Sequence, residues 1–183
     1  MSGYRGTQVF TRLQSALAAG LLVTTFADTA VAGPVDNTVA SHDRAAYSAQ
    51  HLPRLHRDAD QGSPLGAQYV LGALYQLGEV VPQDHAEAVK WFRRAADQGL
   101  AVAQFALGGM CALGQGVPED IVRAHMWLNL SAARAATIAG AERLTRDAQE
   151  MRDALARKMT PAQIEEAEYL ARDWRPRVEL FSD

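Results

Sequence analysis

The apolar positions of this chain follow a helical spacing, and between residues 67 and 132 the whole pattern recurs after 36 residues. In the first period, small and large apolar residues stand at i, i+4, i+7 and i+8, the spacing of one helix face: Ala67, Leu71, Leu74 and Tyr75. A second stripe predicts another helix: Ala88, Trp91 and Ala95. Each period therefore predicts a pair of antiparallel helices.

The repeat can be followed residue by residue. Ala67–Ala96 and Ala103–Ala132 are identical at 12 of 30 positions when they are aligned with a shift of 36. The tetrapeptide Ala59–Gly62 also echoes Ala96–Gly99, at a spacing of 37. Internal periods of 20–50 residues are typical of repeat arrays, in which each unit buries its apolar face against its neighbours.

Polar residues and glycines mark the predicted ends of the helices. Asp84 and Asp120 are predicted N-caps, and Glu87 is predicted to complete a capping box with the first of them. Gly99 is predicted to end the second helix of the first unit. Gly116 stands in a turn where a positive φ is expected.

Two glycines lie inside predicted helices at equivalent repeat positions, Gly72 and Gly108. A glycine in a helix interior costs about 1 kcal/mol relative to alanine. Its recurrence at one repeat position predicts that a neighbouring backbone lies too close to leave room for a Cβ.

The chain divides into seven predicted segments. They are a signal peptide (1–32), a flexible lead (33–44), a degenerate first helix with a break at Pro53 (45–62), repeat 1 (63–98), repeat 2 (99–134), C-terminal capping helices (135–176) and a tail (177–183).

The capping helices have their own apolar stripes. The first stripe is Leu144, Ala148, Met151, Leu155 and Met159, and the second is Ile164, Ala167, Ala171 and Trp174. Thr160 is the predicted N-cap of the last helix, with Pro161 at its first position, Gln163 in a capping box and Pro176 after its end. The outer faces are charged, as the terminal unit of a repeat array requires.

The N-terminal 32 residues have the features of a secretory signal peptide. A basic start, Met1–Arg12, precedes an uncharged run, Leu13–Ala27, which is shorter than the roughly 20 residues of a bilayer span. Small residues before Gly33 form an A-x-A site. We expect cleavage after Ala32, or after Ala27 as second choice, and a mature protein in the periplasm or outside the cell without a stable membrane span. An uncleaved anchor is the alternative.

The composition supports the prediction of helices and limits the classes of partner that the chain can bind. Of the 183 residues, 34 are alanine, which has the highest helix propensity. The formal net charge of −3 argues against nucleic acid as a partner. A single cysteine, Cys111, excludes an intrachain disulfide and a four-cysteine zinc site. The fold predicted is all-α, a short right-handed α-solenoid of antiparallel helix pairs with a C-terminal capping helix pair.

These positions resemble the Sel-one-like repeat (SLR) family, tetratricopeptide-like helical repeat proteins, in their exported bacterial form. The second unit matches the family pattern at Ala103, Leu107-Gly108, Gly114-Gln115-Gly116-Val117, Asp120, Ala124, Trp127 and Ala132. The first unit matches it at Ala67, Leu71-Gly72, Tyr75, Gly78, Val81, Asp84, Ala88, Trp91 and Ala95-Ala96. Val80 and Cys111 depart from the pattern. The resemblance implies a tetratricopeptide-like solenoid that takes part in protein–protein interaction.

Candidate catalytic and metal-binding chemistry is sparse. The chain has no Ser-x-x-Lys, G-x-S-x-G, H-E-x-x-H or P-loop motif. His51 and His56 flank the expected helix break without a cysteine, so we predict no metal and no cofactor. His85 is expected to be solvated, and His125 to be a satisfied structural histidine.

Three further residues are expected to serve packing. Trp91 and Trp127 occupy the same inward repeat position, so both are predicted to be core residues. Cys111 is expected to be a small buried apolar side chain rather than a reactive thiol.

The first helix of each unit lines the concave face in related solenoids, which suggests a binding surface. Tyr69 and Phe105 occupy the same repeat position, and Gln68 and Gln104 stand beside them. Aromatic anchors with polar neighbours suit a protein interface, so these four residues are the predicted protein-binding site. In the alternative, both rings pack against the neighbouring unit.

Two functions are therefore considered. The first is a non-catalytic scaffold or regulator in the bacterial cell envelope, a monomer that binds a protein or peptide on the concave face of the repeats. The second is a cell-wall-associated enzyme or a binder of peptidoglycan fragments.

Overall fold

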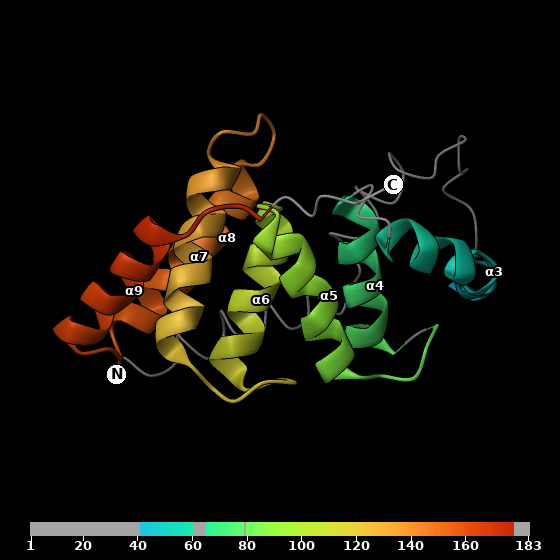
Figure 1. Cartoon of the computed structure of the whole chain (residues 1–183), viewed down its shortest axis with the longest axis horizontal. Helices are drawn as coiled ribbons and strands as arrows, with labels where there is room; N and C mark the ends of the chain where they lie inside the picture. The colour runs from blue at the N-terminus through green and yellow to red at the C-terminus, as the bar shows by residue number, and fades with distance from the viewer. Residues whose placement is uncertain (1–40, 61–64, 79, 178–183) are drawn as a thin grey trace. The chain divides into compact units, whose positions relative to one another are not determined.

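A computed structural model describes residues 41–60, 65–78 and 80–177, with the helix but not the side chains described for 41–50 and 65. This part of the chain forms seven helices and no strand (Figure 1). They are α3 (Ser41–Asp60), α4 (Leu65–Leu77), α5 (His85–Asp97), α6 (Ala101–Leu113), α7 (Ile121–Ala135), α8 (Glu142–Ala156) and α9 (Pro161–Asp173). The predicted signal peptide and residues 178–183 of the predicted tail lie outside the described residues.

The helices reproduce the 36-residue period. The first residues of α4 and α6, Leu65 and Ala101, are 36 positions apart, and so are the first residues of α5 and α7, His85 and Ile121. Each period therefore holds two helices, and the predicted all-α repeat fold is confirmed. The chain divides into two compact units inside the first repeat, with α3 and α4 in Met1–Gln83 and α5 to α9 in Asp84–Asp183.

In the first unit, α3 is longer than predicted. It begins at Ser41, within the expected flexible lead, and continues through Pro53, where a break was expected. That prediction is wrong: a proline removes one helical hydrogen bond and can be accommodated without a break, and Pro53 lies on the exposed side of α3. Beyond the proline, His56 Nδ1 lies 3.0 Å from the Leu52 carbonyl oxygen.

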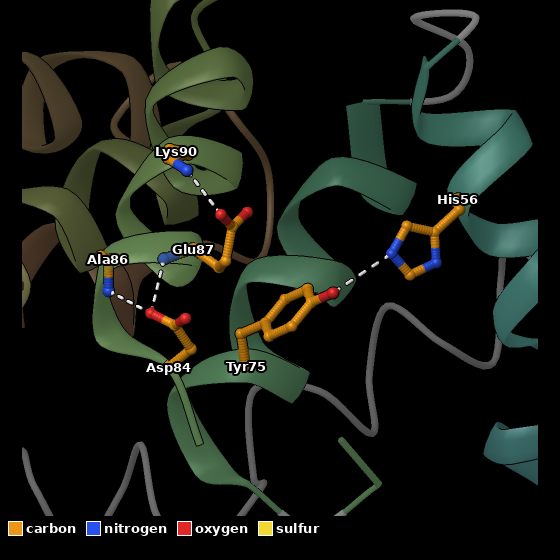
Figure 2. A network of polar contacts seen from close by, with 6 residues as sticks. All are labelled: His56, Tyr75, Asp84, Ala86, Glu87 and Lys90. Atoms are coloured by element: carbon orange, nitrogen blue, oxygen red, sulfur yellow. Dashed lines mark hydrogen bonds and ion pairs between the residues drawn. The ribbon is translucent and has the colours of Figure 1, made fainter. Parts of the chain in front are cut away.

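The same histidine links α3 to α4. The Tyr75 hydroxyl lies 3.4 Å from His56 Nε2, and the two rings meet edge to face with centroids 6.3 Å apart (Figure 2). His51 and His56 therefore lie on one continuous helix and do not flank a break.

In the second unit, α6 is the central helix. Every residue from Ala101 to Ala112 is buried. The helix packs against α5 and α7, and the Met151 methyl of α8 lies 3.7 Å from the place that a Cβ would take at Gly109. A helix that is apolar all round is stable only when neighbours cover every face.

α6 and α7 lie very close together at Gly108. A Cβ at this position would lie 2.9 Å from Leu128 Cγ and 3.3 Å from the Ala124 carbonyl oxygen, both on α7. The close approach predicted from the recurring glycine is confirmed for Gly108, with a leucine side chain as well as the backbone as its neighbours.

Side chains cap the second helices of the repeats at the predicted residues. Asp84 Oδ1 accepts hydrogen bonds from the backbone amides of Ala86 and Glu87 at 2.9 and 3.0 Å (Figure 2). The expected capping box does not form, because the Glu87 carboxylate binds Lys90 one turn further along α5 instead. Asp120 caps α7 by accepting from the Arg123 amide at 2.9 Å.

Gly116 explains how the α6–α7 loop reaches α5. Its φ is +71°, as predicted, and a Cβ there would lie 2.2 Å from the His85 carbonyl oxygen. The loop backbone therefore rests directly on the first turn of α5, where a side chain has no room.

The C-terminal helices follow the prediction in part, since α9 buries Ala167 of its predicted stripe but leaves Ile164, Ala171 and Trp174 half-buried. Both α8 and α9 pack against α7. α8 buries four residues of the predicted first stripe, Leu144, Ala148, Met151 and Leu155, whereas Met159, half-buried, follows the end of the helix. The predicted capping box of α9 is present, since Thr160 Oγ1 accepts from the Gln163 amide and Gln163 Oε1 accepts from the Thr160 amide.

Replacement of Gly108 by alanine tests the close approach of α6 and α7. Because the added Cβ forces Leu128 to move, we expect Gly108→Ala to lower the free energy of unfolding by about 1–2 kcal/mol in urea denaturation. Gly109→Ala is the matched control on the same helix, where the Cβ meets Met151 at 3.7 Å, an ordinary contact. It should leave stability unchanged or raise it by up to about 1 kcal/mol. Equal effects of the two substitutions would contradict this explanation.

Candidate protein-interaction surface

The four residues predicted to bind protein are buried. Tyr69 and Phe105 each expose 3% of their surface, Gln68 none and Gln104 1%. Burial raises the pKa of Tyr69 to about 12. Such burial fits the alternative in which the two aromatic rings serve packing. The assignment of the four residues to a protein-binding surface stays a prediction.

The two glutamines make equivalent hydrogen bonds. Gln68 Nε2 donates to the Ala59 carbonyl at 3.0 Å, and Gln104 Nε2 donates to the Ala96 carbonyl at 3.2 Å. Ala59 and Ala96 are each the second-last residue of a helix, where carbonyls lack the usual amide donor four residues on, and the Ala96 carbonyl also accepts from the Gly99 amide at 2.9 Å. Each glutamine thus ties the first helix of its repeat to the end of the preceding helix. The echo of Ala59–Gly62 in Ala96–Gly99 was the sequence signal for this pair.

The equivalent tryptophans differ in burial. Trp127 exposes only 5% of its surface, as predicted for a core residue. Trp91 is half-buried, with the Arg94 guanidinium 5.0 Å from its ring centroid, so its assignment to the core is wrong. The difference arises in part because Trp127 has an aromatic neighbour near the C-terminus, Trp174, which belongs to no repeat.

After α9, the chain turns back past α7 toward the C-terminal end of α5 (Figure 1). We call residues 174–177, Trp-Arg-Pro-Arg, the C-terminal strap. Trp174 lies edge to face with Trp127, with ring centroids 6.3 Å apart. The Arg177 amide donates to the Asp97 carbonyl at 2.7 Å. Asp97 is the last residue of α5, so the strap satisfies a carbonyl that the helix leaves unpaired.

Gly99 makes room for the strap. This glycine, which ends α5 as predicted, has a φ of +89° and is buried. A Cβ at Gly99 would lie 3.7 Å from Trp174 Cη2 and 4.0 Å from Pro176 Cγ, and 3.9 Å from Arg134 Nη2. We call the surface formed by Trp127, Gly99 and the Asp97 carbonyl the strap site. The sequence pattern predicts Trp174 and Pro176 as the end of a helix and gives no signal for this return to α5.

Two histidines have environments that differ from the prediction. His125 on α7 is 4% exposed, and its Nδ1 is buried without a hydrogen-bond partner, so this structural histidine is not fully satisfied. Burial, with the nearby Arg152 guanidinium, lowers the pKa of His125, while Glu168 and Asp153 oppose the shift. His85 is half-buried, also with an unpartnered Nδ1, and is therefore not simply solvated.

Cys111 has the environment expected of a structural residue. It is 2% exposed, and burial raises the pKa of its thiol, which disfavours the reactive thiolate. Among residues 51–60, 66–78 and 80–177, whose side chains are described, no three His, Cys, Asp or Glu gather as metal ligands would. None of the described helices is both long and apolar enough to cross a bilayer.

Comparison with known proteins identifies the repeats. The family model described as the Sel1 repeat matches residues 66–100 and 101–135. The chain therefore contains two Sel1 repeats, the first formed by α4 and α5 and the second by α6 and α7. Proteins built of this repeat are generally non-catalytic scaffolds for protein interaction. No curated protein matches the chain.

Two solved structures are similar to the chain. One is a protective antigen present in uropathogenic Escherichia coli strains that displays an SLR fold, with 27% sequence identity over 71% of this chain and a TM-score of 0.60. The chain spans only 28% of that protein's length. The other is a Sel1 repeat protein from Oxalobacter formigenes, with 28% identity, a TM-score of 0.44, and coverage of 68% of this chain and 99% of the other.

The burial of the repeat aromatics leads to a prediction that separates packing from binding. Because a glutamate carboxylate at a buried position loses its hydration, we expect Tyr69→Glu with Phe105→Glu to reduce helicity and melting temperature sharply, as measured by circular dichroism. Tyr169→Glu is the control, since Tyr169 is 60% exposed, and it should leave both unchanged. A double variant that folds normally but no longer captures a partner would restore these residues as an interface.

His125 predicts a dependence of stability on pH. Because its pKa in the folded chain is below the ordinary value of 6.5, the unfolded chain binds this proton more readily. The stability associated with neutral His125 is complete above pH 6.5 and is lost as the pH falls toward the folded pKa. Denaturation between pH 5 and 8 should therefore show a steeper loss in the wild type than in His125→Phe. Parallel curves for the two proteins would show that His125 does not contribute.

Proposed function

We propose that the chain is a non-catalytic protein-interaction scaffold of the bacterial cell envelope that binds a protein or peptide partner. The observation that carries the proposal is the pair of Sel1 repeats over residues 66–135, since this repeat generally serves protein interaction. The similar protein from Escherichia coli also displays an SLR fold.

The envelope setting rests on the sequence of residues 1–32. A basic start, an uncharged run of 15 residues and the A-x-A site before Gly33 together support export and cleavage. After cleavage, the proposed mature chain starts at Gly33 and retains both repeats and the C-terminal helices.

Tyr69 and Phe105 are buried, and so is all of α6 from Ala101 to Ala112, so we propose no anchor residue on that helix. No observation on the described residues favours the alternative of a cell-wall enzyme or peptidoglycan binder, and we do not propose it.

Fractionation and capture test the proposal together. The full chain, expressed in a Gram-negative host with its own N-terminus, should be recovered from the periplasmic fraction with Gly33 as its first residue. When it is crosslinked there and purified, it should retain a partner protein at defined stoichiometry by mass spectrometry. The Tyr169→Glu variant serves as a folded control for the wild type. Cytoplasmic protein with an intact Met1 would contradict the setting, and a chain that retains no partner would contradict the scaffold.

A further inference from the structure

The C-terminal strap has the backbone of a bound extended peptide. Trp174 has φ −62° and ψ 137°, close to polyproline II geometry. Arg175 precedes a proline, and sterics restrict such a residue to the same extended region. The strap therefore leaves α9 as a polyproline-like segment rather than as a continuation of the helix.

The strap site has the features that recognise such a segment. Its aromatic element is the buried ring of Trp127, and its glycine, Gly99, leaves space for Trp174 and Pro176. Its polar element is the Asp97 carbonyl, which accepts one backbone N–H. Aromatic surfaces that bind proline-containing segments in polyproline II geometry are a recurring mode of peptide recognition.

The side chains of the C-terminal strap remain largely exposed although the strap occupies the strap site. Arg175, Pro176 and Arg177 are exposed, and Trp174 is only half-buried. The Arg175 guanidinium donates to the carbonyls of Arg172 and Trp174, at the end of α9, and not to the strap site. Attachment in the same chain gives the strap an effective concentration in the millimolar range, which a partner of sufficient affinity can overcome.

Building on the proposed function, we propose that the strap site binds an extended segment of a partner protein. This segment presents an aromatic residue, then any residue, then a proline, followed by a free backbone N–H. The chain's own strap occupies the site until the partner segment displaces it, so the strap acts as an internal competitor.

A peptide with the strap's own sequence tests this proposal on the full chain. The probe is a fluorescein-labelled hexapeptide with the sequence of residues 172–177, RDWRPR, and its control is RDARAR, which has the same charge. We expect RDWRPR to bind the Trp174→Ala variant about tenfold more tightly than the wild type by fluorescence anisotropy, because the internal competitor is weakened. RDARAR should not bind either protein.

A second pair of variants isolates the backbone hydrogen bond. Arg177→Pro removes the N–H that donates to Asp97, whereas Arg177→Ala keeps it. One hydrogen bond of about 1 kcal/mol corresponds to about fivefold tighter binding of RDWRPR to the proline variant. This pair also serves if Trp174→Ala proves unstable.

Three results would overturn the proposal. RDWRPR could bind the folded Trp174→Ala variant no better than RDARAR does, or it could bind Arg177→Pro and Arg177→Ala equally. A wild-type dimer that dissociates in Trp174→Ala would assign the site to the strap of a second copy. If the chain captures a partner but does not bind RDWRPR, the inference about the strap site is wrong and the proposed function stands. If the chain binds RDWRPR but captures no partner, the strap site binds peptide and the proposed function is wrong.

Discussion

The second unit depends on the burial of a helix that has no polar face. From Ala101 to Ala112 every residue of α6 is buried, and the helix carries no charged side chain. Such a helix gains little from its own propensity and must be covered on every side. α5 and α7 cover it as repeat neighbours, and Met151 of α8 reaches it at Gly109. The glycines of α6 serve this packing, since Gly108 admits Leu128 and Gly109 admits Met151.

The parts outside the repeats follow from that constraint. α8 and α9 both pack on α7, so the last repeat helix is not left open to water. The C-terminal strap then returns to the end of α5 and covers Trp127 and Gly99. The four residues Trp174–Arg177 thus cover the end of α5 and occupy the strap site, while α8 and α9 cover α7.

Features set by local chemistry could be predicted from the sequence. The 36-residue period predicted the helix pairs, Asp84 and Asp120 were identified as caps, and Gly108 as a close approach. The errors arise from competing local contacts as well as from distant ones. Pro53 does not break α3, and Glu87 pairs with Lys90 instead of the Asp84 amide. Tyr69 and Phe105 are buried because whole helices pack over them. The residue pattern of a single helix does not show which of its faces a neighbouring helix covers.

The periodicity of apolar residues does not predict the position of the C-terminal strap, because distant contacts determine it. Trp174 continues the stripe of α9 at helical spacing, so its sequence position predicts a helix residue, whereas its backbone is extended. Only the distant partners Trp127 and Asp97 determine where it lies, and neither is marked in the sequence as a neighbour of residue 174.

Amide hydrogen exchange of α6 in the wild type and in Met151→Ala tests the central claim most directly. Met151 is 2% exposed on α8, and its loss leaves a cavity over Gly109. If α6 depends on cover from its neighbours, its amides should be among the most protected in the wild type and should lose protection together with those of α8 in the variant. Unchanged protection of α6 alongside faster exchange in α8 would contradict the account.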